Sequence, residues 1–277
     1  MSIVVAAEIF AISVGSGVLG SLLGLGGGTL LVPVLTLYLG VPIGQAAGAS
    51  LVSTIATSSG AASVLLKERM TNIRLGMFLN LATTAGGLTG ALVAGYFSSG
   101  WIMVIFGLLL LYSALAMFQK RASELPQGVV EHPIAARLGL SGQYSDKSLG
   151  QTVDYKVAGV PTGFGVMYLA GVLSGLLGIG SGALKVLGMD VVMRLPMKVS
   201  TATSNFMIGV TAAAGVGVYL SQGKIEPATA APVALGVLLG AMIGSRLVPV
   251  LKSSTLRRIF VPVLLLIGAQ MVWKGVR

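Results

Sequence analysis

Two glycine-rich stretches and one lysine are the residues whose types and spacing suggest chemistry. The stretch GLGGGTLLVP covers residues 24–33, and GIGSGALKV covers residues 178–186. Glycine permits unwound backbone and the close approach of a ligand, and a helix that restarts after a break directs free N–H groups and its positive dipole end toward the gap. Such an end binds anions. Lys185 follows Gly182 by three residues, and its charge opposes the helix dipole there unless an anion lies between them.

We therefore expect an anion site at the two breaks, completed by polar residues of the segments that follow them. The candidate residues are Gly26, Gly27, Gly28, Thr29, Gln45, Ser50, Gly180, Ser181, Gly182, Lys185, Ser204 and Asn205. Small residues also let membrane helices pack closely, and we favour packing for Gly86, Gly90, Gly236, Gly240 and Gly244. Ser and Thr hydroxyls can also bond to their own helix, so their role stays open.

Enzymatic chemistry has little support in this sequence. There is no cysteine, so the chain has no catalytic thiol and no thiolate metal site. The apolar segments hold no paired carboxylates and no histidine cluster, and the single histidine, His132, stands beside Pro133 in a polar stretch. No strand–turn–helix unit surrounds the glycines, which excludes a nucleotide-binding loop. We expect no enzyme activity, no metal and no cofactor.

The composition places the chain in the membrane class. Hydrophobic residues make up 55%, charged residues only 9%, and the mean hydropathy is +0.92, whereas soluble domains carry roughly a quarter charged residues. The net charge of +10 does not indicate nucleic acid, because the basic residues cluster between apolar runs. The N-terminus lacks a basic leader region, so we expect it to be the first membrane helix.

The sequence contains two copies of one pattern. Residues 17–32 match residues 171–186 at ten of sixteen positions, at an offset of 154. The offset persists without gaps, since Pro42 meets Pro196 and Ser50 meets Ser204. We expect a first membrane repeat over 1–119, a polar cytoplasmic linker over 120–156 that acts as a tether or regulatory segment, and a second membrane repeat over 157–277.

Each copy contains five apolar segments. They cover 3–23, 28–40, 43–66, 75–97 and 100–118 in the first copy, and 157–177, 182–194, 197–221, 228–250 and 256–273 in the second. The second segment is short, because thirteen helical residues reach only about 20 Å against about 30 Å of hydrocarbon. It is therefore either re-entrant, or unwound chain inside the membrane completes the crossing.

If each copy crosses the membrane an odd number of times, the second copy has the inverted topology of the first. The basic loop 67–74 and the linker then face the cytoplasm, while the uncharged turn 98–101 faces outward. The partner of that turn, 251–258, faces inward and has gained three basic residues. Lys224, Lys274 and Arg277 are exceptions on the outer side. The charges therefore predict an all-α integral membrane protein of two inverted-topology repeats, with both termini outside.

The glycine motif resembles that of a known family. GLGGGTLLVPVL, followed by Pro42 and AGASL, and its weaker second copy GIGSGALKV with Pro196, is similar to the TauE/SafE family, also named the 4-toluene sulfonate uptake permeases. The resemblance implies transport of sulfite, sulfoacetate or other organosulfonates. The second copy departs from the pattern, because Ser181 replaces a glycine, Lys185 an aliphatic residue, and Leu187 stands where the first copy has Pro33.

Our leading hypothesis is a secondary transporter that exports small sulfur-containing anions across the cytoplasmic membrane by alternating access. The alternatives are a passive anion channel and a carrier of a different small organic anion. The expected partners are the small anionic substrate and membrane lipid, without nucleic acid. A homo-oligomer is compatible with the sequence, which specifies neither the coupling ion nor the direction of transport.

Overall fold

A computed structural model describes residues 3–37, 39–93, 98–119, 126, 128–177 and 181–276. The first half contains the helices α1 (Ile3–Leu23), α2 (Gly28–Leu37), α3 (Ile43–Leu65), α4 (Ile73–Val93) and α5 (Ser99–Gln119). The second half contains α7 (Val160–Leu177), α8 (Gly182–Leu187), the π-helical turn η2 (Gly188–Val192), α9 (Met197–Ser221), α10 (Pro227–Leu247) and α11 (Ser253–Val276). The predicted all-α membrane class is confirmed.

Helices able to cross a membrane occur in both halves. Within the described residues, five are long and apolar enough to span, namely Val5–Leu23, Ile73–Val93, Met197–Ser221, Pro227–Leu247 and Ser254–Val276. The ten residues of α2 reach only about 15 Å. The short second segments are therefore broken helices, as the glycine clusters predict.

Prolines and glycines set the helix ends near the breaks. Pro42 and Pro196 immediately precede α3 and α9 with φ of −54° and −57°, a backbone geometry that the proline ring imposes. Gly24 and Gly26 have φ of +70° and +76°, in the left-handed region that glycine enters without steric cost. These two glycines end α1 and carry the chain to Gly28, where α2 begins.

Helices of the first half pack against helices of the second half. Helix α1 lies along α10, and α4 lies along α7, while α3 packs on α9 and α5 on α11. Small residues permit this approach. A Cβ on Gly86 would collide with the Tyr168 carbonyl, and one on Gly240 would collide with the Val14 carbonyl. The packing role of these glycines is thus confirmed.

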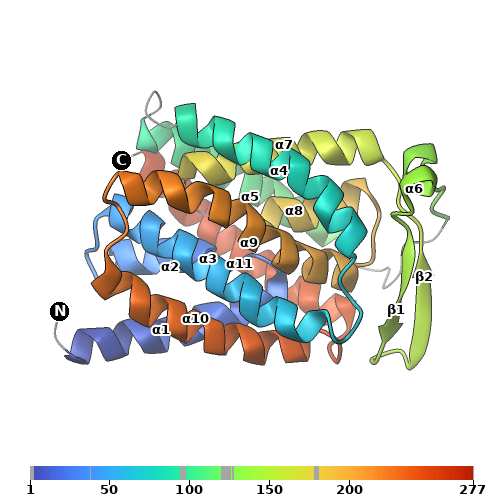
Figure 1. Cartoon of the computed structure of the whole chain (residues 1–277), viewed down its shortest axis with the longest axis horizontal. Coiled ribbons are helices and arrows are strands. Elements are labelled where there is room, and N and C mark those ends of the chain that lie inside the picture. Colours follow the sequence, from blue (N-terminus) through green and yellow to red (C-terminus); the bar gives the residue numbers. More distant parts are fainter. Residues whose placement is uncertain are drawn as a thin grey trace.

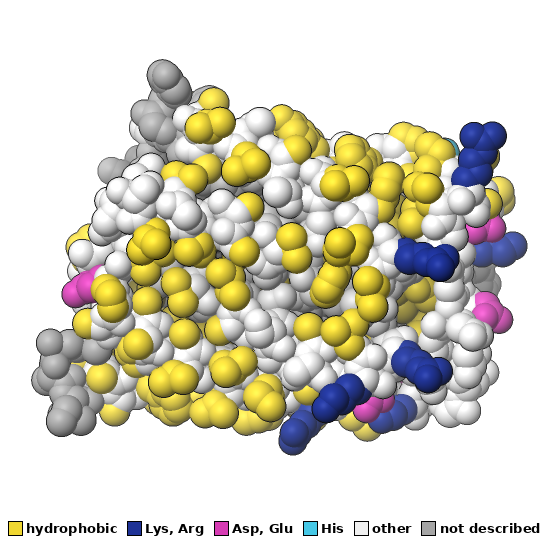
Figure 2. All heavy atoms as spheres, in the orientation of Figure 1, with side chains coloured by type: hydrophobic (Ala, Val, Ile, Leu, Met, Phe, Trp, Pro, Cys, Tyr) yellow, Lys and Arg dark blue, Asp and Glu magenta, His cyan; other side chains and the backbone are white. Residues whose placement is uncertain are grey.

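The two ends of the bundle differ in their content of basic side chains. The N- and C-terminal ends lie on the side opposite the small hairpin of the linker (Figure 1). On the face drawn in Figure 2, Lys and Arg side chains gather at the hairpin end, and apolar side chains cover the length of the helices. This asymmetry is typical of a membrane protein whose basic end faces the cytoplasm.

The described part of the linker is folded, which corrects the expectation of a tether. It forms α6 (Pro133–Leu138) and an antiparallel hairpin of β1 (Gly142–Asp146) and β2 (Gln151–Tyr155). The few apolar side chains suffice because they are buried against the helices rather than in a core of their own. Tyr144 is 2% exposed and Val153 is 8% exposed.

Polar contacts fix this hairpin to both halves. Lys198 Nζ, at the start of α9, donates to Asp146 Oδ1 at 2.6 Å, to Ser148 Oγ at 2.8 Å and to the Pro249 carbonyl at 3.2 Å. From the first half, Asn72 Nδ2 donates to the Tyr155 hydroxyl at 2.9 Å and to the Leu140 carbonyl at 2.6 Å. The hairpin therefore joins the loop before α4 to the ends of α9 and α10.

Candidate functional site

The two glycine breaks meet inside the bundle. A Cβ on Gly182 would collide with the Gly24 carbonyl and with the backbone of Leu25. Ser204 of α9 connects the breaks, because its hydroxyl lies 2.7 Å from the Gly24 carbonyl and 3.4 Å from the Gly182 carbonyl. The next residue, Asn205, donates through Nδ2 to the Ser21 carbonyl at 2.6 Å. The two breaks and the predicted residues Ser204 and Asn205 thus come together.

The N–H groups of the first break already have protein partners. Gly27 N donates to Thr57 Oγ1 at 3.1 Å, while Leu25 N and Gly26 N donate to the Gly20 carbonyl at 2.9 and 3.3 Å. An anion at this break would compete with the Thr57 hydroxyl for the Gly27 N–H. Sequence inspection missed Thr57, although the offset of 154 pairs it with Thr211, whose hydroxyl accepts a hydrogen bond from Lys185.

Several buried side-chain oxygens at the breaks have no hydrogen-bond partner among the described residues. Ser50 Oγ lies against Gly28, where an added Cβ would overlap it. Ser181 Oγ lies at the N-terminus of α8, and Thr201 Oγ1 lies one turn before Asn205 on α9. Buried hydroxyls usually find partners. Ser50 and Ser181 are therefore available to a ligand that accepts hydrogen bonds.

Lys185 is fully buried, and its described hydrogen bond is to a residue of α9 beyond the one that connects the breaks. Its Nζ donates to Thr211 Oγ1 at 2.7 Å, and Thr211 lies seven residues beyond Ser204, which is about 10 Å along a helix. Thr83 Oγ1 of α4 lies 3.1 Å from Thr211 Oγ1, and Asn80 Oδ1 lies 3.3 Å from Thr83 Oγ1. Thr83, Thr211 and Asn80 escaped the sequence analysis because nothing local distinguishes them.

Three predicted residues are not brought to the junction by any described contact. Gln45 is half-buried in the first turn of α3, five residues before Ser50. Thr29 lies in the first turn of α2, and only its backbone is described. Gly180 lies outside the described residues.

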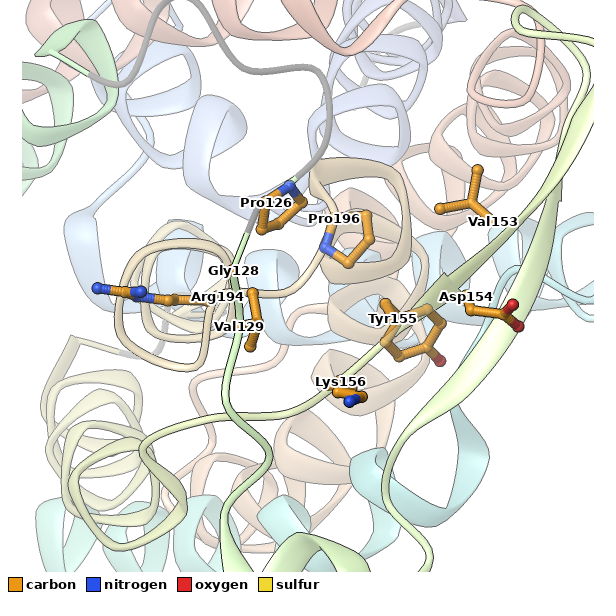
Figure 3. A pocket seen from close by; sticks show the side chains of 9 residues that line it. All are labelled: Pro126, Gly128, Val129, Val153, Asp154, Tyr155, Lys156, Arg194 and Pro196. Atoms are coloured by element: carbon orange, nitrogen blue, oxygen red, sulfur yellow. The ribbon is translucent and has the colours of Figure 1, made fainter.

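A separate cavity of about 450 Å³ lies at the hairpin end. Its lining comes from β2 and from the loop before α9, together with the chain that leads to α6: Pro126, Gly128, Val129, Val153, Asp154, Tyr155, Lys156, Arg194 and Pro196 (Figure 3). Burial raises the pKa of the Tyr155 hydroxyl, against the opposing effect of its hydrogen bond with Asn72. None of the predicted anion-site residues lines this cavity.

Comparisons with known proteins agree with these features. The family model described as "Sulfite exporter TauE/SafE" matches residues 9–271. The chain is 28% identical over 269 residues to "Probable membrane transporter protein YunE" of Bacillus subtilis (strain 168), covering 94% of this chain and 95% of that protein. It is 25% identical over 245 residues to "Probable membrane transporter protein YdhB" of the same organism, covering 87% and 89%.

An archaeal relative extends this similarity. "Probable membrane transporter protein MJ0441" of Methanocaldococcus jannaschii is 27% identical over 213 residues, covering 74% of this chain and 68% of that protein. No solved structure matches the chain. The family model matches nearly the whole sequence, and each half contains membrane-spanning helices and one broken helix. The chain therefore belongs to the TauE/SafE sulfite exporter family of multi-pass membrane transporters.

Proposed function

We propose that this transporter is a secondary carrier of small sulfur-containing anions, namely sulfite, sulfoacetate or other organosulfonates. It would export them across the cytoplasmic membrane by alternating access. The observation that carries the proposal is the meeting of the two broken helices at Ser204. Unwound backbone inside a membrane protein is tolerated where it is enclosed by protein or lines a substrate path.

Inverted repeats would supply the two states of such a carrier, and matched contacts support them. Gly17 lies against the Val237 carbonyl, and their partners at the offset of 154, Gly171 and Thr83, make the same contact. Helix α1 runs toward the hairpin end, whereas α7 starts beside the hairpin and runs the other way (Figure 1). Rocking of one half against the other would open each side in turn.

The junction has the donors that a sulfo or sulfite group would use. The hydroxyls of Ser50 and Ser181 are buried and have no partner among the described residues. The Gly27 N–H would join them when it exchanges Thr57 for a substrate oxygen. Gly26, Gly28 and Gly182 would form the backbone wall, and Asn205 would hold α1 against α9. Lys185 would supply the nearby positive charge.

A passive anion channel is the second candidate, since it could use the same helix ends without alternating states. Counterflow separates the two functions. Proteoliposomes loaded with unlabelled sulfoacetate should transiently accumulate labelled sulfoacetate above its outside concentration if the protein is a carrier. A channel would only equilibrate the label. Substitution of the sulfonate by a short carboxylate tests the remaining alternative, a carrier of another organic anion.

Two conservative substitutions test the location of the site. Ser50→Ala and Ser181→Ala each remove one hydroxyl that makes no hydrogen bond to the described residues, so both variants should fold. Each should weaken sulfite or sulfoacetate binding by roughly tenfold to a hundredfold, as hydrogen bonds to charged groups contribute roughly 1.5–3 kcal/mol. Ser13→Ala is the matched control, because the Ser13 hydroxyl bonds to its own helix at the Ile9 carbonyl. Unchanged binding in both site variants would move the site elsewhere.

A further inference from the structure

Lys185 is a buried basic group that has no acidic partner among the described residues. Its side chain is 0% exposed, and its described polar contact is the Thr211 hydroxyl at 2.7 Å. The two ion pairs of the described residues involve other lysines, Lys147 and Lys198. An unpaired ammonium in a low-dielectric interior is strongly disfavoured, so a buried lysine either loses its proton or acquires an anion.

The fold itself does not need a lysine at this position. At the offset of 154, Lys185 corresponds to Leu31, which is 0% exposed in the first half. Thr211 corresponds to Thr57, and Thr83 corresponds to Val237, also 0% exposed. The first set therefore places leucine and valine with its threonine, whereas the second places a lysine and another threonine at the matching positions.

Within the described part of the chain, no ionisable group near α8 lies within ion-pair distance of Lys185. The elements packed on α8 are α5, α7, α9 and η2, and their ionisable residues are Tyr112, Tyr168, Lys198, Tyr219 and Asp190. Asp190 lies in the π-helical turn η2 that follows α8, and no ion pair joins it to Lys185 among the described residues. Lys198 is bound to Asp146. Arg74 lies at the first turn of α4, nine residues before Thr83.

We propose that Lys185 is the proton carrier of this transporter, so that each anion crosses the membrane together with a proton. The inference rests on the proposed function, because the transported anion is the missing counter-charge. Binding of the anion stabilises the protonated amine, and protonation of the amine strengthens binding of the anion. The two effects are equal by linkage. Anion and proton are therefore taken up and released together.

Thr211 can serve both protonation states. Its hydroxyl accepts a hydrogen bond from the ammonium, and it can donate one to the lone pair of the neutral amine if it gives up its bond to the Met207 carbonyl at 3.1 Å. Thr83, from the other half of the molecule, lies 3.1 Å from the same hydroxyl. Movement of the halves during transport would change this contact. The chain of Lys185, Thr211 and Thr83 thus links the proton to the interface that must rearrange.

The test uses purified protein in liposomes with a pH-sensitive dye inside and the membrane potential held at zero by potassium and valinomycin. Sulfoacetate is a suitable probe because it is fully ionised near neutral pH and carries no proton of its own. An inward sulfoacetate gradient should acidify the lumen. A pH gradient of one unit should drive about tenfold accumulation of sulfoacetate per coupled proton, since one unit corresponds to about 1.4 kcal/mol, or a factor of ten.

Two substitutions test whether Lys185 carries the proton. Lys185→Leu introduces leucine, which is the residue at the matching position 31 of the first copy. This variant should retain slow sulfoacetate flux that neither acidifies the lumen nor responds to the pH gradient. Lys185→Arg keeps a charge that cannot be released, because a guanidinium is not deprotonated in proteins. It should bind sulfoacetate but lose proton movement and accumulation. Leu31→Met is the matched control and should keep the parent ratio of protons to anions.

The outcomes separate this inference from the proposed function. Sulfoacetate or sulfite flux in the parent without proton movement would overturn the proton-carrier role and leave the substrate class intact. Proton-coupled flux of a short carboxylate, but of neither sulfur anion, would retain the role of Lys185 and overturn the substrate class. Coupled sulfoacetate flux that persists in Lys185→Leu or Lys185→Arg would assign the proton to another group. No flux with any of these anions would overturn both.

Discussion

At the scale of single residues, Ser204 and Lys185 are both fully buried but have opposite relations to their surroundings. The Ser204 hydroxyl is satisfied by carbonyls of both breaks, so it belongs to the permanent structure of the site. Lys185 has a hydroxyl partner and, among the described residues, no counter-charge, so its state depends on what else is bound. Substitutions at these two residues should therefore affect different properties.

Ser204→Ala should reduce stability more than it reduces affinity. The substitution leaves the Gly24 carbonyl without its donor at the junction of the breaks, and an unsatisfied buried polar group costs about 1–3 kcal/mol. Thermal unfolding of the purified protein measures the loss. Ser221→Ala should leave the melting temperature unchanged, because the Ser221 hydroxyl bonds to its own helix at an exposed position. Equal melting of both variants would contradict the bridging role.

Lys185→Met should show the reverse pattern. Methionine has similar length and good helix propensity, so the fold should persist. Loss of the charge should weaken binding of sulfite or sulfoacetate by about one to two orders of magnitude, from the roughly 1.5–3 kcal/mol of a hydrogen bond to a charged group. Isothermal titration gives the affinity, with circular dichroism as the folding control. Parent-like binding would remove Lys185 from the site.

At the scale of elements, the hairpin of β1 and β2 is held by a buried ion pair. Lys198 and Asp146 have side-chain exposures of 0% and 2%. Burial by itself would raise the pKa of Asp146, but the hydrogen bonds from Lys198 and Ser148, the charge of Lys198 and the bond from Tyr144 outweigh it. The pKa therefore lies below its ordinary value of 3.8.

Asp146→Leu should destabilise the protein strongly, because it leaves Lys198 buried without a partner. Breaking one side of a buried pair costs about 3–5 kcal/mol, whereas apolar replacement of both sides is often neutral. The double variant Asp146→Leu, Lys198→Met should therefore recover most of the lost melting temperature. Lys147→Ala, which breaks an exposed pair with Glu68, should change it little. No recovery in the double variant would contradict this account.

The same pair should make stability depend on pH. A carboxyl whose pKa is lowered in the folded state binds fewer protons there than in the unfolded state, so its stabilisation is fully present above the unfolded pKa of about 3.9. The stabilisation declines as the pH falls below that value and is lost below the folded pKa. The melting difference between the parent and Asp146→Asn should thus shrink toward acid pH. A constant difference from about pH 3 to pH 7 would exclude Asp146 as its source.

At the scale of the whole molecule, the described ends lie together on the side opposite the hairpin (Figure 1). Lys and Arg side chains gather on the hairpin side in the view of Figure 2. The bias of basic residues toward the cytoplasm therefore predicts that both termini are outside and the hairpin is inside. This orientation would also place the cavity at Arg194 and Lys156 on the cytoplasmic face.

Single cysteines can test this orientation, since the natural chain has none. Ser98 lies in the turn before α5 and Ser145 lies in β1, and both are exposed. In intact cells, an impermeant maleimide should label Ser98→Cys, and it should label Ser145→Cys only after permeabilisation. Shielding of position 98 together with outside labelling of position 145 would show the opposite orientation.

Much of the fold follows from local sequence. The starts of α3 and α9 at positions 43 and 197 were predictable because Pro42 and Pro196 cannot continue a preceding helix and suit the start of a new one. The break at residues 24–27 follows from glycines that adopt positive φ. The packing glycines and the paired serines Ser50 and Ser204 were also recognisable, since a fixed offset relates the two copies. These features depend on residues close together in the chain.

The contacts that complete the site depend on residues far apart, and only the tertiary structure decided them. Thr211 meets Lys185 across 26 positions, and Thr83 meets Thr211 across 128. Nothing near Thr83 in the sequence indicates that its hydroxyl contacts another helix, because a threonine can also bond within its own helix. The linker was misread for the same reason. Its few apolar residues cannot form a core alone, but they are buried once both halves present a surface, and Lys198 then meets Asp146 across 52 positions.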